Sequence, residues 1–247
     1  IFKVKGSYVN GQWFNSKNRY DIFNPSNGEK LSDVPISDKK ELELAVDSAK
    51  KAQLIWSKTS LIERANALEK LAKKILEKEE EFALIDTYDS GNALTGMRKD
   101  VKETVNNIRY FCGLVREVKG ETFSMEKNHL NFTRYQPYGV VLKINPFNHP
   151  FRFCVEKIAA PLLMGNSLII KNSEQAPISS LRFCELLEDI FPKGLINVVT
   201  GGPDNGKFLV EHPDIKRIAV IGSVNTGIAI AKSAAPLLKN ISLELGG

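Results

Sequence analysis

Short apolar runs alternate with segments of helical periodicity through the second half of the chain. Each run is mostly apolar and stops at a polar or glycine-containing turn, as buried strands between helices do. This alternation predicts an α/β fold with a doubly wound, parallel five-stranded sheet. The predicted strands are Val140–Ile144, Ser167–Lys171, Leu195–Thr200, Ile218–Ile221 and Ile241–Leu245, and the predicted helices are Phe151–Leu163, Ser179–Ile190, Asn205–Glu211 and Thr226–Ala235.

The first 119 residues show a different pattern. Apolar and aromatic residues flank Asn10-Gly11, which is the strongest short signal for a β-hairpin. Four amphipathic helical segments follow, and one of them begins at a capping box formed by Ser60 and Glu63. Because their apolar stripes need a common surface, we expect residues 1–119 to form a hairpin and helices that pack on the sheet of residues 139–247.

Residues 120–138 connect these two regions and have the character of a strand. Leu130, Phe132 and Arg134 alternate with their neighbours, and Pro137 ends the run. No adjacent segment offers a hairpin partner. We therefore expect an extended β-arm that pairs with a distant segment or with another subunit.

Composition excludes several classes of protein. The chain has 247 residues, a formal net charge of +5 and 43% hydrophobic residues, which suits a globular domain. Its lysines alternate with glutamates, as between residues 69 and 81, so we expect a solvated surface and no nucleic-acid partner. No apolar run is long enough to span a membrane. The three cysteines suggest buried free thiols in a cytoplasmic protein, without a metal site or disulfide framework.

Polar and glycine residues follow each predicted strand. Ligands of an open parallel sheet bind at the carboxyl ends of its strands, so these residues should meet at one edge. The loop Gly222–Gly227 follows a strand and opens a helix, and such a loop can hold a pyrophosphate at the helix N-terminus. It is neither the usual dinucleotide fingerprint nor a P-loop, and a plain strand-to-helix turn explains it equally well.

Other residues at this edge each have a functional and a structural interpretation. Lys171 and Glu174 flank a strand end, where an acidic residue commonly binds ribose hydroxyls, although a solvated strand end is an equal alternative. Asn148 could stabilise an oxyanion or cap the helix that follows. Glu244 lies between two leucines at the end of a strand that we expect to be buried, where a carboxylate serves either as a general base or in an ion pair.

Four motifs together resemble those of the aldehyde dehydrogenase superfamily. The turn Pro146–Pro150 is similar to the family's Pro-Trp-Asn-Phe-Pro, and Lys171–Glu174 is similar to its Lys-Pro-Ser/Ala-Glu segment. Gly222–Gly227 is similar to Gly-Ser-Thr-x-x-Gly, and Leu243–Gly247 is similar to Leu-Glu-Leu-Gly-Gly. The motifs stand in the family's order, each at a predicted strand end, and the resemblance covers essentially the whole chain.

The resemblance implies a Rossmann-like, dinucleotide-binding core at residues 139–247 and an oligomerisation arm at residues 120–138. It also implies NAD(P)-dependent oxidation of an aldehyde to a carboxylic acid, in which a Cys thiolate attacks the aldehyde. At matched positions, Asn148 would hold the oxyanion and Glu244 would activate the thiol or water. The cofactor, NAD with NADP as the alternative, would contact Ile144, Pro146, Phe147, Lys171, Ser173, Glu174, Gly202, Gly206, Gly222, Ser223, Thr226, Gly227 and Leu245.

This chain departs from the family's motifs at several positions. Phe147 replaces Trp, His149 replaces Phe, Asn172 replaces Pro, and Asn225 replaces Glu. These changes leave the identity of the aldehyde open.

The family's nucleophilic Cys would lie beyond Gly247, in a catalytic domain that this sequence does not contain. Cys112, Cys154 and Cys184 all lie in helical patterns instead. We therefore expect the N-terminal half of an aldehyde dehydrogenase that forms a homo-oligomer at full length, and we expect the 247-residue chain alone to be inactive. The alternative is a half-chain that serves only as a nucleotide-binding or assembly module.

Overall fold

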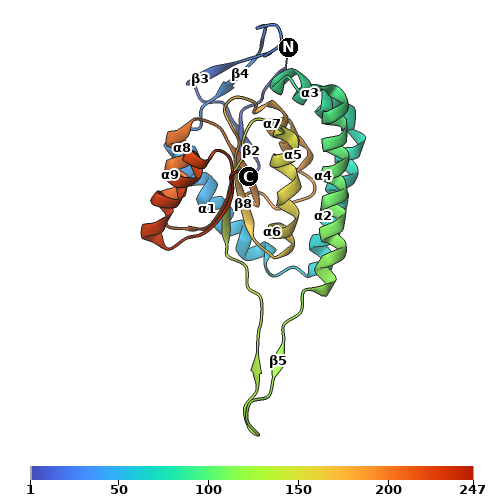
Figure 1. Cartoon of the computed structure of the whole chain (residues 1–247), viewed down its shortest axis with the longest axis vertical. Helices are drawn as coiled ribbons and strands as arrows, with labels where there is room; N and C mark the ends of the chain where they lie inside the picture. Colours follow the sequence, from blue (N-terminus) through green and yellow to red (C-terminus); the bar gives the residue numbers. More distant parts are fainter. Residues whose placement is uncertain (1, 247) are drawn as a thin grey trace.

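The computed structural model describes residues 2–246, so Gly247 of the last motif lies outside the described residues. A seven-stranded sheet with the order β11-β10-β7-β8-β9-β1-β2 forms its centre (Figure 1). The strands from β11 to β9 are parallel, which confirms the predicted doubly wound α/β fold. They are β7 (Val140–Ile144), β8 (Ser167–Lys171), β9 (Ile196–Val199), β10 (Ile215–Ile221) and β11 (Asn240–Glu244).

The sheet has two more strands than predicted, because the N-terminal hairpin joins it. Strands β1 (Ser7–Val9) and β2 (Gln12–Phe14) are antiparallel and meet at Asn10-Gly11, where both residues have positive φ. Tyr8 of β1 pairs with Val198 of β9, and the Asn10 N–H donates to Asn197 Oδ1 at 2.8 Å. The hairpin thereby covers an edge of the parallel sheet that would otherwise be open.

The middle strands are buried on both faces, which explains their nearly continuous apolar sequence. Successive residues of β8 enter different cores: Leu168 and Ile170 join one hydrophobic cluster, whereas Ile169 joins the other. Helices α1 (Lys39–Trp56), α8 (Pro203–Glu211) and α9 (Val224–Ala234) cover one face in Figure 1. Helices α5 (Pro150–Val155), α6 (Ala159–Leu163) and α7 (Ile178–Phe183) cover the other, and α2 (Leu61–Glu77), α3 (Glu79–Ser90) and α4 (Leu94–Leu114) lie outside them.

Two predicted helices are shorter than expected. The segment predicted as one helix over residues 151–163 divides into α5, the 3-10 helix η2 (Glu156–Ile158) and α6, with non-helical backbone at Lys157. Pro161 accounts for the break, because a proline ring inside a helix clashes with the carbonyl four residues earlier, which here is that of Lys157. Likewise, α7 passes into the 3-10 helix η3 (Cys184–Leu186).

Local signals in the N-terminal region are largely confirmed. Ser60 and Glu63 form the predicted capping box of α2, and α3 ends at Gly91, whose φ is 77°. The remaining elements are β3 (Arg19–Phe23), β4 (Lys30–Pro35), η1 (Val115–Glu117) and η4 (Ala235–Leu237), with β3 and β4 forming a separate antiparallel pair.

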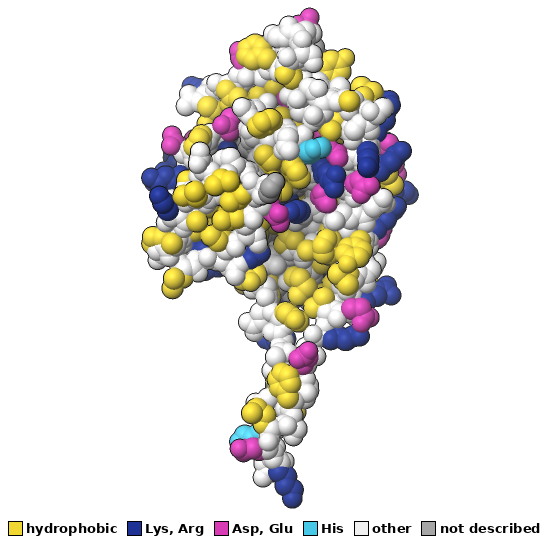
Figure 2. All heavy atoms as spheres, viewed as in Figure 1, with side chains coloured by type: hydrophobic (Ala, Val, Ile, Leu, Met, Phe, Trp, Pro, Cys, Tyr) yellow, Lys and Arg dark blue, Asp and Glu magenta, His cyan; other side chains and the backbone are white. Residues whose placement is uncertain are grey.

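The arm folds back on itself, so the prediction that it lacks a local partner is wrong. Strand β5 (Thr122–Phe123) pairs with β6 (Asn131–Phe132), and the Thr133 N–H donates to the Glu121 carbonyl at 2.9 Å. Each strand has two residues, too few for a sequence pattern to reveal. The arm projects from the body in Figures 1 and 2, and it exposes Phe123, Met125, Leu130, Phe132 and Tyr135.

Within residues 2–246, none of the helices is both long and apolar enough to cross a bilayer. The same residues contain no group of three His, Cys, Asp or Glu side chains placed to hold a metal ion.

Candidate active site

A cavity of about 530 Å³ opens at the carboxyl ends of β7, β8 and β10, beside the first turns of α8 and α9. Its position is the one at which a doubly wound sheet binds ligands. The structure brings together here ten residues that the sequence singled out for cofactor binding: Ile144, Pro146, Phe147, Lys171, Ser173, Glu174, Gly206, Gly222, Ser223 and Thr226.

Three other expected residues do not line this cavity. Gly202 is the N-cap of α8, and Gly227 lies buried in the first turn of α9. A Cβ at Gly227 would lie 2.6 Å from the side chain of Leu245, so the glycine allows Leu245 to pack closely against the helix. Gly227 and Leu245 therefore pack against each other next to the strand-to-helix turn without lining the cavity.

The N-terminus of α9 suits an anion better than that of α8 does. The Ser223 hydroxyl caps α9 by accepting the Thr226 N–H at 3.2 Å, and the first turn contains no acidic residue. In contrast, α8 begins with Pro203, which has no N–H, and carries Asp204 in its first turn. Because a helix N-terminus has a partial positive charge, a phosphate would be most favourable beside Ser223.

Lys171 and Glu174, which also line the cavity, form an ion pair. Their Nζ and Oε2 atoms are 3.3 Å apart, and the Lys171 side chain is buried whereas that of Glu174 is 43% exposed. Burial lowers the pKa of Lys171, and the nearby Glu174 carboxylate opposes that shift. The pair leaves the carboxylate accessible to a ligand at the strand end.

The turn after β7 holds Asn148 at the surface. Asn92 Nδ2 donates to the Asn148 carbonyl at 2.6 Å, and no hydrogen bond of the Asn148 side chain is present among residues 2–246. The N-cap of α5 is His149, so the alternative role of Asn148 as a helix cap is not supported. Its side-chain amide is free to bind a ligand.

Two buried carboxylates of α3, which the sequence did not reveal, hold helices of the core. Asp86 Oδ2 accepts the Phe151 N–H at the start of α5, and Asp89 Oδ2 accepts the Ile178 N–H at the start of α7, at 2.9 and 2.8 Å. Burial raises the pKa of Asp86 to about 7 and that of Asp89 to about 8. In the sequence, both residues look like polar positions of an ordinary amphipathic helix.

Glu244 is exposed, so its expected burial is wrong. It ends β11, an edge strand of the sheet, and 65% of its side chain is accessible. The Lys157 Nζ lies 3.8 Å from Glu244 Oε1 and is the closest charged partner of this carboxylate within the described chain. Glu244 and Asn148 lie at the same end of the sheet, because β11 and β7 are both parallel to β10, which stands between them, and both residues are at or beyond the carboxyl end of their strand.

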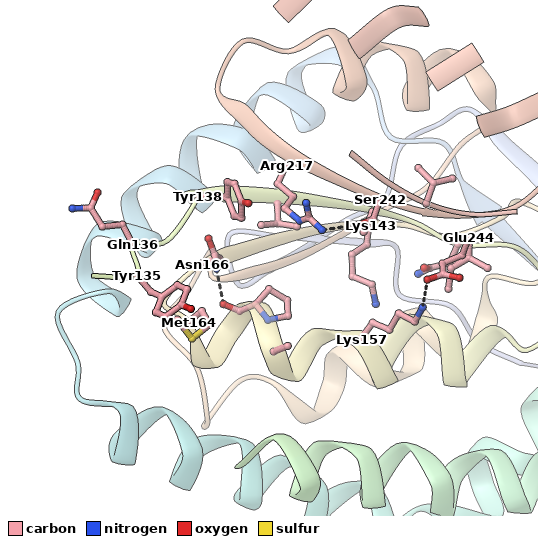
Figure 3. A pocket seen from close by; sticks show the side chains of 17 residues that line it. Tyr135, Gln136, Tyr138, Lys143, Lys157, Met164, Asn166, Arg217, Ser242 and Glu244 are labelled. Atoms are coloured by element: carbon pink, nitrogen blue, oxygen red, sulfur yellow. Dashed lines mark hydrogen bonds and ion pairs between the residues drawn. The ribbon is translucent and has the colours of Figure 1, made fainter. Parts of the chain in front are cut away.

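Glu244 faces a second cavity, of about 410 Å³, which is lined by residues of β7, β10, β11, η2 and α6 (Figure 3). Lys157 approaches the same space from η2, and Lys143 approaches it from β7. This second cavity could not be predicted from the sequence, because its lining residues are spread over 110 positions, from Tyr135 to Glu244.

The three cysteines are buried free thiols, as predicted. Burial raises the pKa of Cys112 to about 11 and that of Cys154 to about 12, and it raises the pKa of Cys184 well above its ordinary value. Because the thiolate is the reactive form, none of these cysteines has the properties of a nucleophile.

Comparisons with known proteins agree on one family. The chain is 36% identical to aldehyde dehydrogenase tropH of Talaromyces stipitatus over 245 residues, which are 97% of this chain and 48% of that protein. It is 38% identical to 4-trimethylaminobutyraldehyde dehydrogenase of Rattus norvegicus over 226 residues, or 91% of this chain and 46% of that one. The chain thus spans about half the length of these relatives.

Solved structures show the same relationship. The betaine aldehyde dehydrogenase of Staphylococcus aureus in complex with NAD+ superimposes with a TM-score of 0.95 at 34% identity, covering 99% of this chain and 50% of that one. Residues 13–247 of this chain match the model of the aldehyde dehydrogenase family. The chain therefore belongs to the aldehyde dehydrogenase family and corresponds to about half of its relatives' length.

Proposed function

We propose that this chain supplies the cofactor-binding half of an enzyme that oxidises an aldehyde to a carboxylic acid with NAD. The observation that carries this proposal is the cavity at the carboxyl edge of the sheet, which ten of the expected cofactor-binding residues line. The NAD+ complex of the related S. aureus enzyme supports the choice of cofactor.

The residues of the cavity fit a dinucleotide. Ser223 and the N-terminus of α9 would bind the pyrophosphate, and Glu174 would accept hydrogen bonds from an adenosine ribose. Gly206 and Gly222 leave the wall open: a Cβ at either position would lie no nearer than 3.8 Å to its surroundings. NAD supplies the acceptor for the hydride that leaves the substrate.

Two further residues would act on the substrate. The free amide of Asn148 would donate to the oxyanion that forms when a nucleophile attacks the aldehyde. Glu244 would remove a proton from the thiol or from the hydrolytic water, and its exposure leaves it accessible for this role. The nucleophile must come from outside residues 2–246, because the thiols of Cys112, Cys154 and Cys184 are buried and protonated.

The burial of all three cysteines also favours a second function, in which the 247-residue chain binds nucleotide or assists assembly without catalysis. We also propose a division into residues 1–119, an assembly arm at 120–138 and a dinucleotide-binding core at 139–247. The hydrophobic side chains on the projecting arm support an assembly role in a homo-oligomer.

Titration of the chain with NAD tests the cofactor site. Asp caps helices as well as Ser does, so Ser223→Asp should preserve α9 while placing a carboxylate where the pyrophosphate binds. We expect the affinity for NAD to fall about tenfold or more, since like charges at close range cost more than 1 kcal/mol. Ser26→Asp adds the same charge at an exposed turn and serves as the control. Unchanged NAD affinity in Ser223→Asp would reject the proposed site.

Formation of NADH, followed by its absorbance, tests the catalytic roles. The 247-residue chain should show no oxidation of a panel of aldehydes. A longer chain that includes a downstream Cys should be active, and Glu244→Gln or Asn148→Ala should then slow turnover by roughly a hundredfold. Activity of the shorter chain that survives replacement of all three cysteines by serine would refute this assignment.

A further inference from the structure

Lys143 is a buried lysine that the proposed function does not use. It lies in the middle of the sheet on β7, and its side chain points toward α5 and α6, on the face that carries the second cavity (Figure 3). Only 2% of the residue is exposed, yet it contributes to the cavity wall. An amine in this position needs an explanation, because burying an ammonium group is costly without a paired anion.

No carboxylate pairs with Lys143 among the described residues. Its Nζ donates instead to two backbone carbonyls at the end of α5, those of Phe153 and Cys154, at 3.0 and 3.1 Å. The break at Lys157 frees these carbonyls, because the residues that would bond them in a continuous helix are displaced. A neutral amine has two N–H donors, so it can satisfy both carbonyls and keep its lone pair unused.

We propose that Lys143 is a covalent capture site for small apolar aldehydes, which enter the second cavity and form an imine with its amine. This inference rests on the proposed function only for the choice of an aldehyde as the reactant. The amine that attacks must be neutral, and burial lowers the pKa of Lys143 to about 8, with the nearby Lys157 acting in the same direction. About a tenth of the amine is therefore uncharged at pH 7, a much larger share than for a lysine of ordinary pKa.

The walls of the cavity select the class of aldehyde. Val141, Ala160, Pro161 and Met164 form an apolar surface beside the amine, and the volume of about 410 Å³ accommodates a small molecule. Lys157 and Arg217 add two positive charges, against one carboxylate from Glu244. An uncharged, apolar aldehyde fits this environment, whereas an aldehyde that carries a quaternary ammonium group is disfavoured by desolvation and by charge repulsion.

The reaction balances without an oxidant or reductant. The nitrogen lone pair attacks the carbonyl carbon, and one amine proton moves to the carbonyl oxygen to give a carbinolamine. The hydroxyl group then takes up a proton from the solvent and leaves as water, while the nitrogen lone pair forms the carbon–nitrogen double bond. The resulting iminium keeps one N–H, which can still donate to one of the two α5 carbonyls.

Reductive trapping tests this proposal on the 247-residue chain. The chain is incubated with butanal and cyanoborohydride, which reduces the iminium to a stable secondary amine, and the modified lysines are located by peptide mass spectrometry. Lys239 is a matched internal control, because its pKa is also lowered to about 8 but it lies outside this cavity. We expect Lys143 to be modified about tenfold faster than Lys239, and modification of Lys143 at or below the Lys239 rate would overturn the proposal.

Three comparisons separate the cavity from other causes of reactivity. Ala160→Phe fills part of the cavity and should slow modification of Lys143 while leaving Lys239 unchanged. Unfolding the chain in urea should abolish the difference between the two lysines. Betaine aldehyde, which is cationic, should modify Lys143 more slowly than butanal does. An unchanged Lys143 rate in Ala160→Phe, a Lys143 preference that persists in urea, or equal rates with butanal and betaine aldehyde would each count against the cavity. None of these comparisons depends on NAD binding or aldehyde oxidation, which are measured separately.

Discussion

Lys171 and Glu174 place opposite charges at the end of β8, on the wall of the cofactor cavity. Their order in the sequence showed that both would lie at a strand end, because the apolar run stops at Lys171. Which of the two side chains contacts a ligand depends on how deeply each is buried, and the sequence pattern did not predict this. The structure buries the lysine and leaves the carboxylate exposed, so the carboxylate dominates at the surface.

We expect Glu174 to favour NAD over NADP, because a carboxylate repels a 2′-phosphate and accepts hydrogen bonds from a 2′-hydroxyl. Glu174→Gln should reduce this preference several-fold, or by about 1 kcal/mol. The ratio of the two dissociation constants, measured by calorimetry, tests this expectation. Glu29→Gln, at an exposed position just before β4, is the control. An unchanged ratio in Glu174→Gln would assign the selectivity to another residue.

Glu244 shows where prediction at the level of single residues failed. Two flanking leucines suggested a buried strand, but β11 lies at the edge of the sheet and most of Glu244 is exposed. The order of strands within a sheet depends on contacts between distant segments, which an apolar pattern does not encode. The chemical identity of Glu244 was apparent from its motif, whereas its environment required the structure.

At the level of elements, helix α3 stabilises the core through its carboxylates. Asp86 and Asp89 supply hydrogen-bond acceptors to the first turns of α5 and α7, neither of which has a side-chain cap from its own N-cap residue. Asp86 also fixes the turn that carries Asn148, because the Phe151 N–H that it accepts lies three residues further along the chain. Helix α3, which lines neither of the two cavities, thus holds the segment next to Asn148.

Burial of Asp86 predicts a dependence of stability on pH. Its pKa is raised from 3.8 in the unfolded chain to about 7 in the fold, so the folded state binds more protons between these values. The free energy of unfolding should therefore decrease as the pH rises from about 4 to about 7, and Asp89 should extend the decrease to about pH 8. Denaturant unfolding at pH 5, 6, 7 and 8 measures this slope.

Asp86→Asn separates the charge from the hydrogen bond, since its amide oxygen can still accept the Phe151 N–H. The variant should lose less stability than the parent between pH 5 and pH 8, by up to a few kcal/mol, because one pKa unit corresponds to about 1.4 kcal/mol. Asp47→Asn, at an exposed position of α1, should leave the slope unchanged. A parent slope that is flat, or identical in Asp86→Asn, would show that Asp86 does not titrate in this range.

Among the helices and strands, the sequence predicted the features that depend on residues close together in the chain. The capping box of α2 and the five parallel strands follow from short-range patterns, and both are present. The hairpin that extends the sheet and the second cavity depend on contacts between residues far apart in sequence, such as Tyr8 with Val198. Those features could not be derived from periodicity alone.

On the scale of the whole molecule, the arm is the feature that the compact body does not explain. It projects away from the sheet as a hairpin with two-residue strands, and a hairpin this short is marginally stable by itself. Its exposed apolar side chains favour association with another chain, which would bury them. We therefore expect the 247-residue chain to associate in a concentration-dependent way.

Replacing two of these side chains tests whether the arm mediates association. Leu130 and Phe132 are 71% and 66% exposed, so a double variant with Leu130→Ser and Phe132→Ser should shift the sedimentation velocity distribution toward smaller species without lowering the thermal stability of the body. Phe23 and Leu54, which are 52% and 61% exposed on the body, give a matched control when both are replaced by serine. Equal distributions for the arm variant and the parent would contradict this role. Strong amide protection of residues 131–135 in a monodisperse monomer would contradict it as well, because an arm without a partner should exchange its amide hydrogens rapidly.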